Sequence, residues 1–252
     1  MPSVLSLLSL VGALVSPPVP SVDAPHPCLT SEGAPLPVIE RPLDSGEGPL
    51  VLLLTGDGGW ANADEQVARG LKARGSPVVG VNMRAYLRTR RTPDEAARDL
   101  ACVARAYGEA WKRDRLLLLG YSRGADVAPF AAARWPADLR ARLTMVALVS
   151  MSSRANFQFH LIDLVRDVER PDDLAIEPQI ERLRGLDVLC VYGADEPTSG
   201  CFKTDTTIVR RVARAGGHRI TEGFDAIAGL LAPALVAPRQ PTAPPAPSPR
   251  PR

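Results

Sequence analysis

A serine lies between two glycines in the stretch "LLLLGYSRGADVAPFAAA" at residues 116–133. Gly120, Ser122 and Gly124 form the pattern G-x-S-x-G, which predicts a nucleophilic serine where it follows a strand and begins a helix. The leucines before it and the alanines after it favour that context. Side chains in place of the glycines would collide with the packed strand and helix. The alternative is a serine that only caps a helix.

A serine hydroxyl needs a base, and histidine is the usual one. In the α/β-hydrolase fold, where this motif occurs, the chain order is serine, acid, histidine. The three histidines are His26, His160 and His218, and only His218, in "ARAGGHRI", comes late enough to follow an acid. The glycines before it allow the backbone to bend toward the serine. His160 remains an alternative, and a surface histidine in a glycine turn is another.

The acid is expected at the carboxyl end of the strand "DVLCVYG", where parallel strands of the sheet end together. Asp195 follows this strand closely, so we predict that it orients the ring of His218 and stabilises its protonated form. Glu196 is adjacent and remains open as an alternative. Asp187 lies at the other end of the strand and is a poor candidate.

A glycine-rich loop, "TGDGGW" at residues 55–60, follows the first expected strand of the sheet. In this fold that loop supplies one backbone N–H group of the oxyanion site, and the residue after the nucleophile supplies another. We therefore expect the amides of Asp57 or Gly58 and of Arg123 to bind the oxyanion. The loop lacks the G-K-[ST] ending of a phosphate-binding P-loop.

Four side chains near these positions are expected to contact the substrate. Trp60 and Tyr121 neighbour the loop and the nucleophile, and Arg84 and Arg88 lie in "MRAYLRTRRTP" after another strand. Arginine binds phosphate through paired hydrogen bonds, so a lipid phosphate is a suitable ligand. A solvated arginine-rich loop is the alternative.

Alternating apolar runs and amphipathic stretches predict a mostly parallel sheet flanked by helices, that is, an α/β fold. One helix begins at "TPDEAARDLACVARAYGEAW", where Thr92 and Glu95 form a capping box around Pro93. Residues 152–181 lie where the α/β-hydrolase fold carries a small lid, and two alternatives are open for them: contact with a membrane surface, or packing against the domain. The expected strands are Leu50–Leu54, Val78–Val81, Leu116–Leu119, Leu143–Val149 and Val188–Val191.

Composition limits the classes of function. The chain has 252 residues, 45% of them apolar, and a net charge of +2, which suits one globular core and gives no general attraction for nucleic acid. The cysteine and histidine spacings contain no zinc motif, and the expected chemistry requires neither a metal nor a cofactor. In an oxidising compartment Cys190 and Cys201 would pair and fix the acid loop, the alternative being two buried thiols.

The ends of the chain differ in composition from its middle. We expect a signal peptide over residues 1–24, whose apolar run "VLSLLSLVGALV" has the length of an export signal. We expect a Pro-rich linker over residues 25–48, the α/β-hydrolase domain over residues 49–236 and a disordered Pro-rich tail over residues 237–252. Export follows from this organisation, and the expected compartment is the periplasm.

Several motifs together resemble a known family. These are "GDGGW", "PVVGVNMRAYLRTRRTPDEAARDL", "GYSRGADVAPF", "VYGADEPTSGC" and the glycine-flanked His218, in that order. The chain resembles the VirJ/AcvB family of bacterial virulence-associated exported serine hydrolases, which have the α/β-hydrolase fold, and the likeness covers roughly residues 50–235.

The resemblance implies a triad of Ser122, Asp195 and His218, an oxyanion pocket shaped by "GDGGW", and work outside the cytoplasm. It also implies aminoacylated phosphatidylglycerol as a substrate. Arg123 and Arg219 replace the aromatic, apolar or histidine residues typical of the family. Both are expected to add positive charge beside the site, which would disfavour a lysyl ester.

The predicted function is hydrolysis of a carboxylic ester through a covalent serine intermediate. A thioesterase or acyltransferase would use the same residues with a different acyl donor or acceptor. The alternative from another class is a non-catalytic periplasmic binding or chaperone-like protein of the same fold, linked to virulence or secretion. A full set of serine, acid and histidine in the expected order favours the enzyme.

Overall fold

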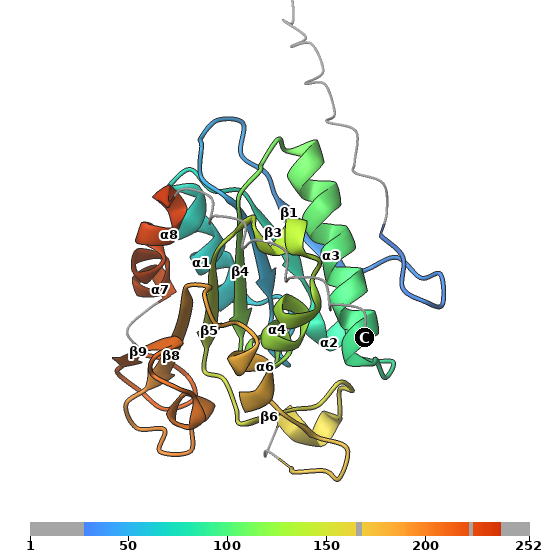
Figure 1. The fold of residues 1–252 in the computed structure, drawn as a ribbon, viewed down its shortest axis with the longest axis vertical. Helices are drawn as coiled ribbons and strands as arrows, with labels where there is room; N and C mark the ends of the chain where they lie inside the picture. Colours follow the sequence, from blue (N-terminus) through green and yellow to red (C-terminus); the bar gives the residue numbers. More distant parts are fainter. Residues whose placement is uncertain (1–27, 165–167, 222–223, 238–252) are drawn as a thin grey trace, which may run out of the picture.

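A computed structural model of the chain describes residues 28–164, 168–221 and 224–237, so the expected signal peptide and nearly all of the expected tail lie outside the described residues. Seven strands form one sheet in the order β1-β3-β2-β4-β5-β8-β9 (Figure 1). All neighbouring pairs are parallel except β1 with β3. The α/β-hydrolase architecture predicted from the sequence is confirmed.

The central strands are almost entirely apolar because helices cover both faces of the sheet. All residues of β2 (Leu50–Leu54), β3 (Val78–Val81) and β5 (Leu143–Val149) are buried. β4 (Leu116–Tyr121) and β8 (Val188–Gly193) are each a little longer than the sequence predicted. Each of the two added stretches, Gly120–Tyr121 and Tyr192–Gly193, leads directly into a loop of the candidate site.

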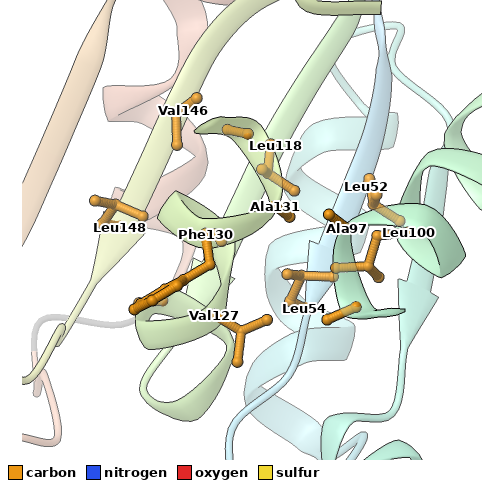
Figure 2. Close-up of a cluster of buried hydrophobic side chains, with 14 of the residues drawn as sticks. Leu52, Leu54, Ala97, Leu100, Leu118, Val127, Phe130, Ala131, Val146 and Leu148 are labelled. Atoms are coloured by element: carbon orange, nitrogen blue, oxygen red, sulfur yellow. The ribbon is translucent and has the colours of Figure 1, made fainter. Parts of the chain in front are cut away.

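Helices pack in two layers. α3 (Pro93–Ala110) and α4 (Arg123–Arg134) cover one face, and Figure 2 shows their apolar side chains packed against the strands. α1 (Asn62–Lys72), α7 (Phe224–Leu230) and α8 (Ala232–Val236) cover the other face (Figure 1). The two short helices α2 (Met83–Tyr86) and α5 (Ala137–Arg140) lie in connections. No helix in the described ranges is long and apolar enough to cross a membrane.

The start of α3 has the expected capping box. The backbone N–H of Glu95 donates to Oγ1 of Thr92 at 3.2 Å, and the N–H of Thr92 donates to Oε2 of Glu95 at 2.8 Å. These bonds satisfy two donors at the helix end, and Pro93 occupies the first turn, where no N–H is needed.

The described part of the segment expected to be a linker over residues 25–48, from Cys28 onward, contributes to the domain. Val38–Arg41 form the edge strand β1, antiparallel to β3. Cys28 forms a disulfide with Cys102 of α3, with an S–S distance of 2.02 Å. The surrounding proline and glycine concealed this strand, because four residues are too few to give an apolar pattern. The folded domain therefore begins before residue 49.

A second edge strand, β9 (Val209–Arg214), pairs with β8 and was also absent from the sequence prediction. Its sequence, "VRRVAR", contains three arginines, and only its first residue is fully buried. An edge strand faces solvent along one side, so it does not need the continuous apolar run of a central strand. β9 matters for function because His218 lies in the loop that follows it.

Residues 152–181, called the insert below, separate β5 from β8 where a small lid was expected. The insert contains the short antiparallel pair β6 (Arg154–Ala155) and β7 (Leu174–Ala175), the 3-10 helix η1 (Leu161–Leu164) and α6 (Glu177–Glu181). It lies beyond the end of β5, at the lower end of the sheet in Figure 1. A second 3-10 helix, η2 (Gly200–Lys203), follows β8.

Candidate active site

Ser122 lies at a sharp turn between β4 and α4. Its backbone has φ +51° and ψ −119°, a conformation that residues with a side chain adopt only at an energetic cost. The turn is fixed by the N–H of Ser122, which donates to the carbonyl of Val149 at 2.8 Å, and by the N–H of Asp126, which donates to the carbonyl of Ser122 at 3.0 Å. This is the strained geometry that the G-x-S-x-G motif predicts.

The two motif glycines are needed for close packing. A Cβ atom on Gly120 would lie 2.4 Å from the carbonyl oxygen of Gly124, and one on Gly124 would lie 2.1 Å from that of Leu54. Both distances are far below any ordinary contact with backbone atoms. Strand, turn and helix can approach one another here only where side chains are absent.

His218 reaches Ser122 from the loop after β9. Its Nε2 lies 2.9 Å from Oγ of Ser122, a hydrogen-bonding distance. The loop packs against the end of β8: a Cβ on Gly193 would lie 2.0 Å from the carbonyl oxygen of Gly217, and the N–H of Asp195 donates to the carbonyl of Gly216 at 2.9 Å. The absence of a side chain at Gly193 therefore allows the end of β8 to approach the histidine loop, and Gly216, with φ +105°, allows that loop to bend.

The carboxylate that contacts His218 comes from Glu196. Its Oε1 lies 2.7 Å from Nδ1 of His218, and its side chain is only 13% exposed. The prediction of Asp195 was wrong for this position, since the side chain of Asp195 is exposed and only its backbone N–H joins the histidine loop. The N–H of Glu196 donates to the carbonyl of Gly193 at 3.0 Å, and this turn directs residue 196 toward the ring.

The other histidine alternative is not supported. His160 lies in the insert, where its carbonyl accepts a hydrogen bond from the N–H of Asp163, and its ring makes no hydrogen bond to Ser122. Ser122, His218 and Glu196 thus form a continuous chain from hydroxyl to imidazole to carboxylate. The strand ends of β4 and β8 and the loop after β9 position them.

The glycine-rich loop lies against Ser122. A Cβ on Gly56 would be 3.2 Å from Cβ of Ser122. The N–H groups of Asp57 and Gly58 donate to no backbone acceptor in the described part of the chain. The N–H of Arg123 is in the first turn of α4, where a helix leaves its N–H groups unpaired. The three expected donors therefore lie on the two segments that border the hydroxyl.

The guanidinium of Arg123 is turned inward, contrary to the expectation that it adds positive charge to the site. Its side chain is 8% exposed, and it donates to both carboxylate oxygens of Asp57 at 3.1 Å and to Oδ2 of Asp163 at 2.9 Å. Although burial opposes the charged form, the hydrogen bond to Asp57 and the nearby carboxylates raise the pKa of Arg123. Arg219, the other expected cation, is exposed.

Asp126, in the first turn of α4, is buried beneath the site. Its Oδ1 accepts a hydrogen bond from the N–H of Ser152 at 2.7 Å, which links α4 to the start of the insert. Burial raises the pKa of Asp126 to about 7, and the charge of Arg123 and the bond from Ser152 oppose this rise.

Two of the expected substrate contacts pack elsewhere. The indole N–H of Trp60 donates to Glu65, and its ring lies over β3, where a Cβ on Gly80 would be 2.2 Å from it. Trp60 thus fills the space left by a glycine in the sheet. Tyr121 packs against the core on the α1 side, and burial raises its pKa. Their aromatic character reflects packing, which sequence alone does not separate from ligand contact.

Arg84 and Arg88 lie at the carboxyl edge of the sheet, where they were expected. Arg84, in α2, stacks over the ring of Phe159 in the insert at 5.2 Å. Arg88 follows α2 and is exposed. Both remain candidates for contact with a ligand that approaches along the insert.

A disulfide closes the loop that contains Glu196. Cys190 in β8 and Cys201 in η2 are joined with an S–S distance of 1.98 Å, the pairing considered from sequence. With Cys28–Cys102, a pairing not predicted from the sequence, all four cysteines are paired. Within the described ranges no group of three or more His, Cys, Asp or Glu residues has a geometry that could hold a metal ion.

Comparison with solved structures shows that the chain has the fold of α/β-hydrolases. It is similar to Est1E from Butyrivibrio proteoclasticus (TM-score 0.59, 12% identity, 81% of this chain and 95% of that one). It is also similar to XC6422 from Xanthomonas campestris, described as an α/β serine hydrolase without a lid (TM-score 0.56, 19% identity, 88% and 100%). A 2,6-dihydroxy-pseudo-oxynicotine hydrolase gives a TM-score of 0.59 at 18% identity, covering 86% and 69%.

No curated protein matches the chain in sequence. The identities to the solved structures are low, so these structures establish the fold alone. A family model described as "Bacterial virulence protein (VirJ)" matches residues 49–237, most of the described domain. The chain therefore belongs to the VirJ family of bacterial virulence proteins, as its motifs indicated, and has the α/β-hydrolase fold.

Proposed function

We propose that this protein is a serine hydrolase that cleaves a carboxylic ester, with Ser122 as nucleophile, His218 as general base and Glu196 as the acid. The observation that carries the proposal is the pair of contacts on one imidazole, 2.9 Å from Nε2 to the hydroxyl and 2.7 Å from Nδ1 to the carboxylate. A ring so held can accept the serine proton while the carboxylate stabilises the resulting imidazolium.

The reaction runs in two halves. His218 removes the proton from Ser122 as its oxygen attacks the ester carbonyl, and the backbone N–H groups of Arg123 and of Asp57 or Gly58 stabilise the oxyanion. His218 then protonates the leaving alcohol, which leaves an acyl group on Ser122. Water, deprotonated by the same ring, releases the acid and restores the hydroxyl. No cofactor is required by this sequence of steps.

A fluorophosphonate probe tests the proposal. The wild-type protein is expected to form an adduct on Ser122, detected by mass spectrometry, and to hydrolyse a p-nitrophenyl ester. Ser122→Ala is expected to abolish both. A folded wild-type protein that forms no adduct would favour the non-catalytic binding or chaperone-like protein instead, since such a protein has no need of an activated serine.

We propose aminoacylated phosphatidylglycerol as the substrate, on the strength of the resemblance of the motifs. The expected objection was repulsion between a lysyl group and Arg123. The pairing of that guanidinium with Asp57 and Asp163 weakens this objection, because the charge of Arg123 is compensated locally. Release of lysine from lysyl-phosphatidylglycerol by wild type and not by Ser122→Ala would support the assignment, and hydrolysis of simple esters alone would oppose it.

We also propose export to the periplasm and contact with a membrane surface. Two disulfides support an oxidising compartment. In the insert Leu161 is 71% exposed and Ile162 41%, an exposed aliphatic pair that suits a lipid surface. Sedimentation with phosphatidylglycerol vesicles, compared between wild type and a Leu161→Ser, Ile162→Ser variant, tests the contact. Fractionation of cells tests the export.

A further inference from the structure

The side chain of Arg123 joins three segments of the site. Its Nε and Nη2 donate to Oδ1 and Oδ2 of Asp57 in the glycine-rich loop, each at 3.1 Å. The same Nη2 donates to Oδ2 of Asp163 in η1 at 2.9 Å. The planar guanidinium therefore has fixed partners on two sides, one in the loop before α1 and one in the insert.

Asp163 is the most enclosed member of this group. Its side chain is 2% exposed, and besides Arg123 it accepts hydrogen bonds from Arg170, at 2.6 Å to Oδ1 and 3.3 Å to Oδ2. Asp57, Arg123, Asp163 and Arg170, called the charge chain below, contain two positive and two negative groups. Their side chains are 17%, 8%, 2% and 16% exposed, respectively.

A contribution to folding stability is by itself a poor explanation for the charge chain. Removing charges from water costs about as much as their attraction returns, so buried ion pairs are often replaceable by apolar residues. Their better-attested effect is to specify one arrangement over others. In this protein the arrangement concerns the two segments that border Ser122.

The guanidinium of Arg123 connects the two segments that contain the candidate oxyanion donors, α4 and the glycine-rich loop. One donor is the backbone N–H of Arg123 itself, and the other belongs to Asp57 or to its neighbour Gly58. The side chains of residues 123 and 57 thus bind each other, and their backbone amides belong to the two segments that border Ser122. The distance between the two segments is therefore set by the same bonds that bury the guanidinium.

We propose that Asp163 is a positioning residue for ester hydrolysis. By accepting from Nη2, the nitrogen that also donates to Asp57, it holds the guanidinium in the orientation that meets Asp57, and so fixes the oxyanion donor of the loop relative to that of α4. The insert thereby contributes to the rate without touching the reacting atoms. This inference rests on the proposed hydrolase function.

The test compares Asp163→Asn with Asp172→Asn. Asp172 also lies in the insert and pairs with Arg90 at 2.9 Å, but both side chains of that pair are exposed, which makes it a matched control. Rates on a p-nitrophenyl ester are measured per active site, titrated with the fluorophosphonate. Inhibition by a boronic acid, whose tetrahedral adduct on Ser122 carries the oxyanion charge, is measured in parallel.

Loss of a whole oxyanion donor lowers kcat by about 10²–10³-fold. Asp163→Asn loosens a donor without removing it, so kcat is expected to fall by about 10-fold. The affinity for the boronic acid is expected to fall by about the same factor as kcat, and KM is expected to stay within two-fold of wild type. Asp172→Asn is expected to match wild type in all three. A purely structural role would lower the melting temperature and the titrated fraction of active protein while leaving kcat per site unchanged.

A second variant covers the case in which Asp163→Asn does not fold. Arg123→Lys keeps the charge and the backbone N–H but cannot make the paired hydrogen bonds to Asp57. It is expected to show the same fall in kcat and in boronate affinity as Asp163→Asn. Wild-type kcat per site in either folded variant would overturn the inference while leaving the hydrolase intact. A wild-type protein that forms no adduct and cleaves no ester would overturn both.

Discussion

Glu196→Gln, with Asp195→Asn beside it, tests which carboxylate serves His218. When His218 takes the serine proton, it becomes a cation whose Nδ1 is 2.7 Å from Oε1 of Glu196. Two unit charges at that separation interact by about 6 kcal/mol at an effective dielectric of about 20. The His218 side chain is 46% exposed, so water screens part of this, and we expect about 4 kcal/mol, or about 10³-fold in kcat.

The glutamine also changes which ring nitrogen has the proton. Its amide can donate to Nδ1 of His218, which favours a proton on Nε2 and so leaves no acceptor for the hydroxyl of Ser122. The assay is hydrolysis of a p-nitrophenyl ester at constant pH with active sites titrated. Asp195→Asn is expected to stay within two-fold of wild type, because its side chain is exposed. A larger loss for Asp195→Asn than for Glu196→Gln would refute the reasoning.

Three further changes address the scaffold of the site. Gly124→Ala is expected to destabilise the fold by about 3 kcal/mol in thermal unfolding, since its Cβ would lie 2.1 Å from a backbone oxygen of Leu54. Replacing Cys190 and Cys201 by alanine removes a disulfide across 11 residues, which is expected to cost about 2–3 kcal/mol in denaturant unfolding and to lower kcat, since Glu196 lies in the closed loop. Burial raises the pKa of Asp126 from 3.8 to about 7, so the folded state binds the proton of this carboxyl more tightly than the unfolded state. The free energy that the bound proton contributes to folding is complete below pH 3.8 and is lost as the pH rises through 7. The melting temperature of wild type relative to Asp126→Asn is therefore expected to fall by about 5–10 °C between pH 5 and pH 8, and an unchanged difference would contradict the assignment.

The sequence by itself determined the five central strands of the sheet and the serine at its centre. Buried parallel strands must be apolar along their whole length, so the five central runs stood out. The sharp turn at Ser122 could also be predicted, because only glycine permits the close approach of β4 to α4. The few histidines of the chain left His218 as the base that fits the order of the fold.

The two edge strands, by contrast, could be identified only in the tertiary structure. β1 and β9 each have one neighbour in the sheet and include charged residues, so neither has a run that differs from a loop. The same limit applies to aromatic side chains. Nothing in the sequence separates a Trp60 that covers Gly80 from one that contacts a ligand.

The choice between Asp195 and Glu196 was also decided only by the fold. Adjacent residues in a turn point in different directions, and a difference of one position reverses which carboxylate faces the ring. That direction depends on the turn at Gly193 and on its contact with the histidine loop, which lies more than twenty residues away in sequence. The inward direction of Arg123 has the same origin, because its partners Asp57 and Asp163 come from segments that only folding brings together. Sequence patterns report what a residue is and how its neighbours repeat, whereas the contacts of a polar side chain depend on distant backbone.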